Sequence, residues 1–322
     1  MATASKRIDL EILRRRFNYG DALVRAIVLL GAASIVLVLA GIVYVLTDHA
    51  WKSITEFGFG FFTGQTWDPV KLKFGALPAI YGTVVSSLVG LAIAVPISLG
   101  VAIFLSEVAP RFIRVPVSFL VEMLAAVPSV VFGLWGIFVL GPRIRDPLEK
   151  TLGDWLGWLP FFAGPALPVG ILAAAIILAI MILPIITAIS RDVLQAVPQS
   201  QREAAMALGA TKWETIWSVV LPYGRSGITG AVILGLGRAV GETMAVTMLI
   251  GNQYKIDISL FSPAHTLAST IASEFSEAAN PLYLSAIVEL GLVLMAVTLV
   301  VNVTARLLVW RISTRAGGGG QL

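Results

Sequence analysis

The sequence predicts an all-α polytopic membrane protein with six transmembrane helices, and three observations support this fold class. Of the 322 residues, 57% are hydrophobic and only 13% are charged, whereas soluble domains carry roughly 25% charged residues. The apolar residues gather in runs of about 20, the length that a helix needs to cross a hydrocarbon core of about 30 Å. The mean hydropathy of the chain is +0.88, so most of the chain is expected inside the membrane.

The composition also excludes several kinds of chemistry. The chain has no cysteine, which excludes disulfides, cysteine-ligated metals and thiol chemistry. Its only histidines, His49 and His265, fall in predicted loops, so no metal centre or Ser-His site is expected. The net charge of +4 comes from basic residues at the membrane edges rather than from one patch, so no nucleic-acid partner is expected.

Six apolar runs define the predicted membrane helices. They cover residues 25–47, 79–105, 117–141, 168–190, 225–250 and 283–310. The first run is about 22 residues long and lacks a small-residue cleavage site, so we expect it to remain as an anchor rather than be removed as a signal peptide. The basic tail before it is either a helix on the anionic inner leaflet or only a topology anchor.

These runs divide the chain into four parts and set its orientation. The parts are a basic cytoplasmic tail (1–24), the first helix with its external loop (25–77), a membrane domain (78–311) and a flexible C-terminal tail (312–322). The two termini and the loops 106–116 and 191–225 carry about twice as many Lys and Arg residues as the other three loops. The positive-inside rule therefore predicts that both termini and the 191–225 loop are cytoplasmic.

Aromatic residues gather in the two predicted external loops, 48–76 and 142–167. They are Trp51, Phe57, Phe59, Phe61, Phe62 and Trp67 in the first loop and Trp155, Trp158, Phe161 and Phe162 in the second. Aromatic side chains near span ends are typical of the interfacial belt. The alternative is that these loops receive an external protein that delivers a substrate.

The third predicted span contains a break. Pro128 lacks a backbone donor and is expected to open the helix, which a membrane tolerates where protein or a water-filled cavity satisfies the freed groups. Ser129, next to it, is a candidate substrate-path residue; the alternative is a kink in which its hydroxyl bonds its own backbone. Pro96 and Pro184 predict similar breaks without adjacent chemistry.

The fifth predicted span holds two charges, Arg238 and Glu242, one turn apart. A charge at the bilayer centre costs at least about 2.5–3.5 kcal/mol, so each needs a partner or a polar cavity. One interpretation is a structural ion pair between the two. The other is an oxyanion path, because a guanidinium offers two parallel donors to an oxyanion, with Thr243 supplying a hydroxyl. Gly237 and Gly241 would let another helix approach.

Three further acids lie in or near the spans. Glu289 either pairs with Arg238 or faces another subunit. Glu107 and Glu122 lie nearer the cytoplasmic edge and are expected to be solvated or to cap helices.

Residues 198–222, between two apolar runs, predict a helix–turn–helix at the membrane surface. Ser200 and Glu203 have the spacing of a capping box, Gly209 permits a sharp turn, and Pro222 is expected to stop the second helix. The apolar side chains of that second helix are expected on one face; they are Trp213, Ile216, Trp217 and Val220. Such a segment offers a polar, alanine-rich surface to a soluble partner, unless it is an ordinary connector.

This segment resembles the EAA loop, the coupling segment of ATP-binding-cassette (ABC) importer permeases. The matching residues are Glu203, Ala204, Ala205, Gly209, Leu221 and Pro222, and Val219 stands where the pattern has Ile. With this segment, the runs 235–246 and 127–133 resemble the phosphate-specific members of the family, and among them the C-type permease subunits. The likeness extends over nearly the whole chain from about residue 78.

The resemblance implies the type I ABC importer permease fold, with 78–311 as an ABC type-1 transmembrane domain in a bacterial plasma membrane. It implies inorganic phosphate as substrate, Arg238 and Glu242 as the transport-critical charges, and 198–222 as the ATPase-coupling loop. The implied partners, besides membrane lipid, are a second homologous permease, a cytoplasmic ATPase dimer and an extracytoplasmic phosphate-binding protein. No catalytic residue, metal or cofactor is expected in this chain; ATP and Mg²⁺ would lie on the ATPase.

Two other functions agree less well with the sequence than a permease subunit does. An ion-coupled secondary transporter would use Glu242 as proton carrier, but leaves the pattern of 203–222 unexplained. An intramembrane enzyme acting on lipid would need paired acids, a metal set or a nucleophile with a base. The chain has no Gly-Lys dipeptide and hence no Walker A loop, so ATP hydrolysis is expected from another chain.

Overall fold

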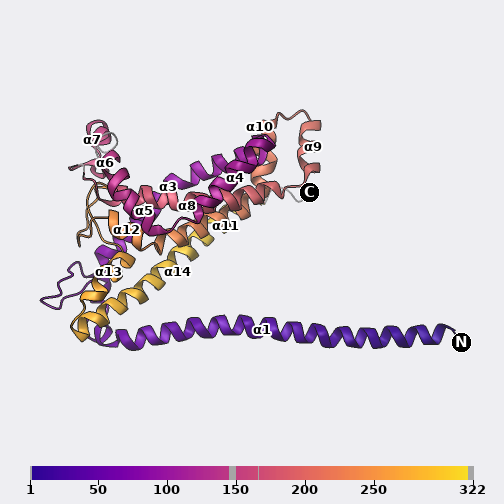
Figure 1. Cartoon of the computed structure of the whole chain (residues 1–322), viewed down its shortest axis with the longest axis horizontal. Coiled ribbons are helices and arrows are strands. Elements are labelled where there is room, and N and C mark those ends of the chain that lie inside the picture. Colours follow the sequence, from indigo (N-terminus) through magenta and orange to yellow (C-terminus); the bar gives the residue numbers. More distant parts are fainter. Residues whose placement is uncertain (1, 145–149, 166, 318–322) are drawn as a thin grey trace.

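The computed structural model describes residues 2–144, 150–165 and 167–317, and over these ranges the chain is helical apart from loops and two isolated bridges, which confirms the all-α class. The helices, labelled as in Figure 1, are α1 (Ala2–Phe57), α2 (Gly60–Thr63), α3 (Leu77–Ile103), α4 (Arg111–Ala125), α5 (Ser129–Trp135), α6 (Gly141–Ile144), α7 (Lys150–Leu156), α8 (Ile171–Gln195), α9 (Gln199–Ala207), α10 (Lys212–Thr215), α11 (Leu221–Val240), α12 (Met244–Leu249), α13 (Leu267–Glu274) and α14 (Pro281–Gly317).

Among the described residues, five helical segments are long and apolar enough to cross a membrane, and a bent pair makes a sixth crossing if it counts as one span. The five are Gly20–Phe57, Leu77–Val108, Ile171–Gln195, Lys212–Val240 and Pro281–Leu307. The start of α1 and the end of α14 lie at the same end of the molecule as α9, whereas α7 and α13 lie at the opposite end (Figure 1). We call these the coupling end and the loop end.

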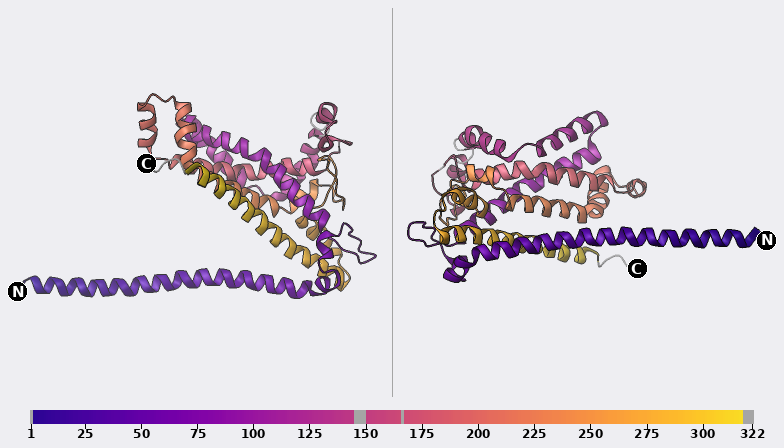
Figure 2. Two further views of the ribbon diagram at one scale, coloured as in Figure 1. Left: turned by 180° about the vertical axis from the view of Figure 1, so that it is seen from behind. Right: turned by 60° about the horizontal axis from the view of Figure 1, so that its bottom comes forward.

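Helix α8 is the centre of the bundle. Of its most apolar stretch, 72% is buried inside the molecule, compared with 28% for the span of α3 and none for that of α1. Small residues let α3 approach it closely: a Cβ on Gly90 would lie 3.0 Å from the carbonyl oxygen of Ala175. Helix α1 stands apart from the bundle over most of its length and meets α14 near its C-terminal end (Figures 1 and 2).

The expected breaks at Pro96 and Pro184 are wrong, because α3 and α8 both continue through their prolines. Hydroxyl groups near the prolines bond across the contact between the two helices. The Ser98 hydroxyl donates to the Leu183 carbonyl (3.2 Å), and the Thr187 hydroxyl donates to the Ser98 carbonyl (3.4 Å). These two bonds fasten α3 to α8 beside the prolines.

Pro222 also does not stop its helix. Residues 212–240 form one helical segment of 29 residues in which a π-helical turn, Ile216–Val220, precedes the proline. A wider turn relieves the clash between a proline ring and the carbonyl four residues before it. The predicted fifth span, 225–250, is therefore wrong at both ends: its helix begins near Lys212 and ends at Val240.

The external aromatic residues separate into two groups. Phe61 and Trp67 are buried, so the belt interpretation is wrong for them. They belong to an aromatic core at the loop end, in which Trp67 stacks on Tyr254 (centroids 5.5 Å apart) and Phe74 stacks on Tyr283 (5.2 Å). Other members of the predicted set are exposed, as a belt or a docking surface requires; they include Trp51, Phe59, Trp155, Trp158 and Phe161.

The two histidines lie in different surroundings, and the prediction that both are in loops is wrong for His49, which lies within α1. His265 precedes α13 and is only 2% exposed. Its ring stacks on Tyr254 with centroids 4.2 Å apart, and its Nδ1 lies 3.1 Å from the Ser269 hydroxyl oxygen. Burial lowers the pKa of His265 to about 4 from its ordinary value of 6.5, because the charged imidazolium is poorly solvated there.

The close approach of α3 to the loop before α13 gives a first prediction. A Cβ on Gly82 would lie 2.0 Å from the His265 carbonyl oxygen, whereas one on Gly100, in the same helix, would meet nothing within 4 Å. Gly82→Ala is therefore expected to lower the thermal unfolding midpoint in detergent by several degrees. Gly100→Ala is the matched control and should leave the midpoint unchanged or slightly higher. Equal midpoints for the two variants would contradict this packing.

The buried histidine gives a second prediction. Between pH 6.5 and about 4 the unfolded chain binds a proton at His265 that the folded chain excludes. The free energy of unfolding should therefore fall as the pH falls through this window, while above pH 6.5 the contribution is fully present. Thermal midpoints across this range should show a shallower slope for His265→Gln than for His49→Gln, the control in exposed α1. Equal slopes of midpoint against pH for the two variants would contradict the lowered pKa of His265.

Candidate functional site

Two interrupted helices pack against each other inside the bundle. Helix α5 follows the break at Pro128 and α12 follows a second break, after α11. Glycines allow the contact: a Cβ on Gly133 would lie 2.4 Å from the Met248 sulfur, and one on Gly136 would lie 2.3 Å from a methyl group of Leu249. The two breaks are therefore held together by one apolar contact.

The break at Pro128 is confirmed. The axes of Arg111–Ala125 and Ser129–Arg143 differ by 92°, with Pro128 extended between them (ψ 140°). Ser129 is the first residue of α5 and is half-buried. The bend turns the backbone of this span out of the regular helical pattern, which leaves polar groups available at the bend.

The second break separates the two predicted charges. Helix α11 ends at Val240, and Glu242 and Thr243 lie in the turn before α12. A Glu242 carboxylate oxygen accepts from the backbone N–H of Ala245 (3.4 Å), and the Thr243 hydroxyl donates to the Gly241 carbonyl (3.3 Å). Glu242 thus caps α12.

No ion pair joins Arg238 to Glu242 within the described part of the chain. The i,i+4 pair expected from a continuous helix is wrong, because the helix ends between them. Arg238 instead lines a cavity of about 790 Å³ between α8, α11 and α14. Asn302 and Arg306 of α14 line the same cavity. The structure therefore groups Arg238 with residues that were not predicted, and places Glu242 and Thr243 in the turn that follows its helix.

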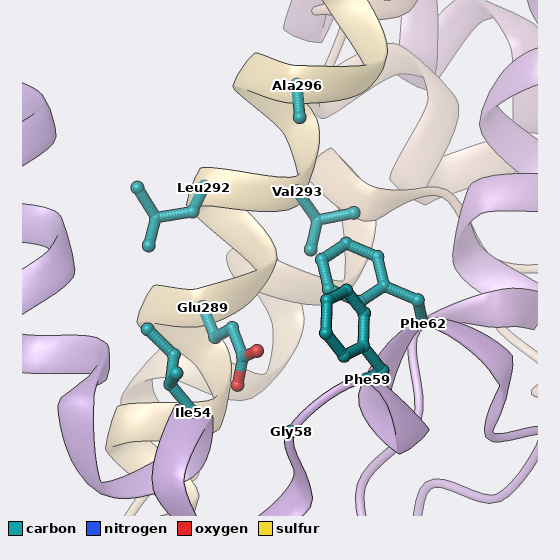
Figure 3. Close-up of a pocket in the computed structure, with 8 residues that line it drawn as sticks. All are labelled: Ile54, Gly58, Phe59, Phe62, Glu289, Leu292, Val293 and Ala296. Carbon is teal, nitrogen blue, oxygen red and sulfur yellow. The ribbon is translucent and has the colours of Figure 1, made fainter.

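Glu289 lies in a different pocket and forms no ion pair with Arg238 in the described residues. Its side chain points from α14 into an apolar pocket of about 340 Å³, facing Phe59 and Phe62 (Figure 3). The residue is 3% exposed, and its Oε2 has no hydrogen-bond partner in the structure. Of the two alternatives, pairing with Arg238 is excluded, and facing another subunit stays open.

The coupling segment has the predicted helix–turn–helix form but a different cap. Helix α9 begins after Pro198, and Ser200 makes no capping bond, so the predicted capping box is wrong. The capping box lies at the second helix: the Thr211 hydroxyl accepts from the Glu214 N–H (3.3 Å), and a Glu214 carboxylate oxygen accepts from the Thr211 N–H (2.8 Å). Pro198 already fixes the start of α9, which leaves Ser200 inside the helix.

The turn of this segment is exposed. Gly209 adopts φ +91°, a left-handed conformation that favours glycine, as predicted. Glu203 and Ala204 are exposed, Ala205 is half-buried, and Leu208 is 90% exposed. The segment projects from the bundle at the coupling end (Figure 1).

The apolar side chains of α10 and the turn after it do not share one face. Ile216 and Val220 are buried, whereas Trp213 and Trp217 are exposed and lie edge to face, with centroids 5.8 Å apart. The expected single face is therefore wrong, because the π-helical turn changes the angle between successive residues. The two exposed tryptophans lie at the start of the candidate span Lys212–Val240, and tryptophan near a span end is typical of an interfacial anchor.

An unpredicted ion pair fastens the coupling segment to the bundle. Arg202 of α9 bonds to both carboxylate oxygens of Glu107, at 2.8 and 3.3 Å, and the two side chains are only 13% and 9% exposed. Arg202 also donates to the carbonyls of Leu194 (2.7 Å) and Val197 at the end of α8. The expectation that Glu107 is solvated or a helix cap is wrong, because it holds α9 against α3 and α8.

Glu122 is also not simply solvated: its carboxylate accepts from Arg191 of α8 at 3.2 Å, although it is itself exposed. This contact joins α4 to α8 near the coupling end. Exposed ion pairs contribute little stability, so Glu122 adds less to the attachment of the helices than Glu107 does.

The sequence of this chain is similar to those of known transport proteins. Residues 94–314 match the family model described as binding-protein-dependent transport system inner membrane component. A protein of Mesorhizobium japonicum named phosphate transport system permease protein PstC is 45% identical over 94% of each chain. Proteins of the same name from Pasteurella multocida (46% identical, 89% of this chain and 90% of that one) and Haemophilus influenzae (43%, 94% and 98%) are similar. The inward-facing MetNI methionine ABC transporter has a TM-score of 0.49, is 17% identical and covers 74% of this chain and 94% of its own.

The bonds that Arg202 makes to Glu107 and to two backbone carbonyls give a third prediction. Arg202→Met removes the ion pair and both carbonyl bonds, while Glu107→Gln leaves the carbonyl bonds in place. Breaking a buried pair costs up to about 3–5 kcal/mol, so we expect faster amide hydrogen exchange over 199–207 in both variants, and a larger change in Arg202→Met. Glu203→Gln, an exposed neighbour in the same helix, is the control. If amide hydrogen exchange over 199–207 is as slow in Arg202→Met as in the wild type, the bonds of Arg202 do not hold α9.

Proposed function

The chain belongs to the family of binding-protein-dependent transport system inner membrane components, and we propose that it is the permease subunit of an ATP-driven importer of inorganic phosphate. The observation that carries the proposal is the projecting segment 198–222. It offers exposed Glu203, Ala204 and Leu208 beyond the membrane spans, and it is tied to α3 and α8 by Arg202. The substrate is taken from the names of the relatives.

In the proposed complex this chain has four kinds of neighbour, and ATP is hydrolysed by another chain. A second, homologous permease completes the transport path, a dimer of cytoplasmic ATPases docks on 198–222, and an extracytoplasmic protein delivers phosphate at the loop end. Membrane lipid surrounds the spans, and ATP with Mg²⁺ binds to the ATPase chains. The chain is a multi-pass membrane protein; the proposed site is the bacterial inner membrane, with both termini in the cytoplasm.

In the proposed mechanism the chain moves an anion without forming or breaking covalent bonds. Closure of the ATPase dimer pushes on α9, and the Arg202–Glu107 pair passes the displacement to α3 and α8. The guanidinium of Arg238 offers paired donors to the oxyanion as it passes. Glu242 and Thr243, in the turn after α11, and Ser129, at the bend before α5, would contribute polar groups where the helices are interrupted.

Uptake of labelled phosphate into proteoliposomes tests this function. Arg238→Gln in the assembled complex should reduce ATP-driven uptake at least about tenfold, since a charge-assisted hydrogen bond contributes about 1.5–3 kcal/mol, while ATP hydrolysis continues. Arg238→Lys retains the positive charge but not the paired donors of the guanidinium, so its phosphate uptake should lie between that of the wild type and that of Arg238→Gln. Lys255→Gln, an exposed lysine paired with Asp257, is the control.

Two results would contradict the proposal at different levels. Unchanged uptake in Arg238→Gln would remove Arg238 from the substrate path and leave the permease assignment intact. Uptake that needs no ATPase chain would overturn the importer assignment itself and favour an ion-coupled transporter.

A further inference from the structure

We propose that Arg306 and Asn302 of α14 form a second binding position for the transported oxyanion, on the coupling-end side of Arg238. The inference rests on the proposed function and deepens it, because it adds residues to the transport path. The three residues line one cavity of about 790 Å³ between α8, α11 and α14. That volume is many times the roughly 30 Å³ of one water molecule, so a hydrated tetrahedral anion fits.

The position of these residues follows from helix geometry. Asn302 and Arg306 are four residues apart on α14 and therefore lie on one face, one turn apart, about 6 Å along the axis. Helix α14 runs from the loop end to the coupling end (Figure 1). Arg306 is thus the member nearer the coupling end, where an imported ion would leave.

Glycine brings α11 against this face. A Cβ on Gly237 would lie 3.8 Å from the Asn302 Nδ2 and 3.9 Å from its Oδ1, so the amide of Asn302 packs beside the backbone that carries Arg238. The Oδ1 atom is buried without a hydrogen-bond partner. The NH₂ group of the same amide is a donor from which an anion in the cavity can accept.

The charge of the cavity selects its ligand. Arg238 and Arg306 bring two guanidinium groups to it, and no described carboxylate forms an ion pair with either. Arg238 and Arg306 lie within the candidate spans Lys212–Val240 and Pro281–Leu307, Arg306 at the end of its span. The other lining side chains, such as Ile185, Ile233 and Leu299, are apolar. An anion with several acceptor oxygens offsets both charges and matches the fork of each guanidinium.

The absence of native cysteine allows a direct test. Val303→Cys, which lines the cavity and is 45% exposed in the wild type, would be the only thiol of this chain. In the assembled complex we expect an anionic methanethiosulfonate reagent to label it several-fold faster than a cationic one of similar size. Arg306→Gln should weaken this preference, since only Arg238 then remains in the cavity, Arg306→Lys should keep most of it, and inorganic phosphate should slow labelling.

Val70→Cys, in the exposed loop at the loop end (92% exposed), is the control and should show no phosphate protection. Transport gives the second readout: Arg306→Gln should reduce phosphate uptake several-fold, with ATP hydrolysis retained, and Asn302→Asp should reduce it further by adding a negative charge. Wild-type uptake together with an unchanged reagent preference in Arg306→Gln would overturn the inference and leave Arg306 as a membrane-edge anchor.

Further measurements distinguish a wrong second position from a wrong proposed function. If vesicles containing phosphatidylglycerol protect Val303→Cys without inorganic phosphate, and phosphatidylcholine vesicles do not, the cavity binds a lipid headgroup and the inference is wrong. If Arg238→Gln abolishes uptake and Arg306→Gln does not, the proposed function stands and the second position is wrong. If the intact complex transports no phosphate, the proposed function itself is wrong, whatever the labelling shows.

Discussion

The structure depends on one constraint: inside a membrane, every interrupted helix and every charge must find its polar partner within the protein or in a cavity. One span is bent at Pro128 and another ends at Val240, and the helices that follow these breaks, α5 and α12, pack on each other through Gly133 and the adjoining Gly136. The buried helix α8 supports them from the centre of the bundle. Arg238 is exposed and lines an open cavity between α8, α11 and α14. The helix breaks at Pro128 and after Val240, together with Arg238, therefore supply polar groups to the bundle.

The same bundle links this path to the surface. Arg202 joins the projecting helix α9 to Glu107 at the end of the α3 span and to two carbonyls at the end of α8. Because α8 packs along both α3 and α11, a displacement of α9 reaches the helix that carries Arg238 through few intermediates. Separating this largely buried ion pair is costly, because it would leave uncompensated buried charges, so the pair keeps α9 fastened to the bundle.

Much of the fold was predictable, and the failures have physical causes. Apolar runs of about 20 residues located the spans, and Pro128 and Gly209 located a break and a turn. The end of α11 at Val240 was missed because Gly241 is tolerated in a membrane helix and gives no clear stop signal. The Arg202–Glu107 pair joins residues 95 positions apart, and no local pattern reports such a contact. Likewise, the sequence pattern identifies Arg306 only as a basic residue near a membrane edge. The cavity that it shares with Arg238 is visible only in the structure.

Residues 198–222 are the proposed surface on which a separate ATPase acts. The most direct measurement is photo-crosslinking from a benzoylphenylalanine at Leu208, the 90% exposed residue beside the turn, in the assembled complex. We expect a crosslink to the ATPase chain that changes in yield when ATP binds, and none from the same probe at Trp155, which is 80% exposed at the loop end. A Leu208 probe that crosslinks only to lipid, or to no ATPase, would contradict this proposal.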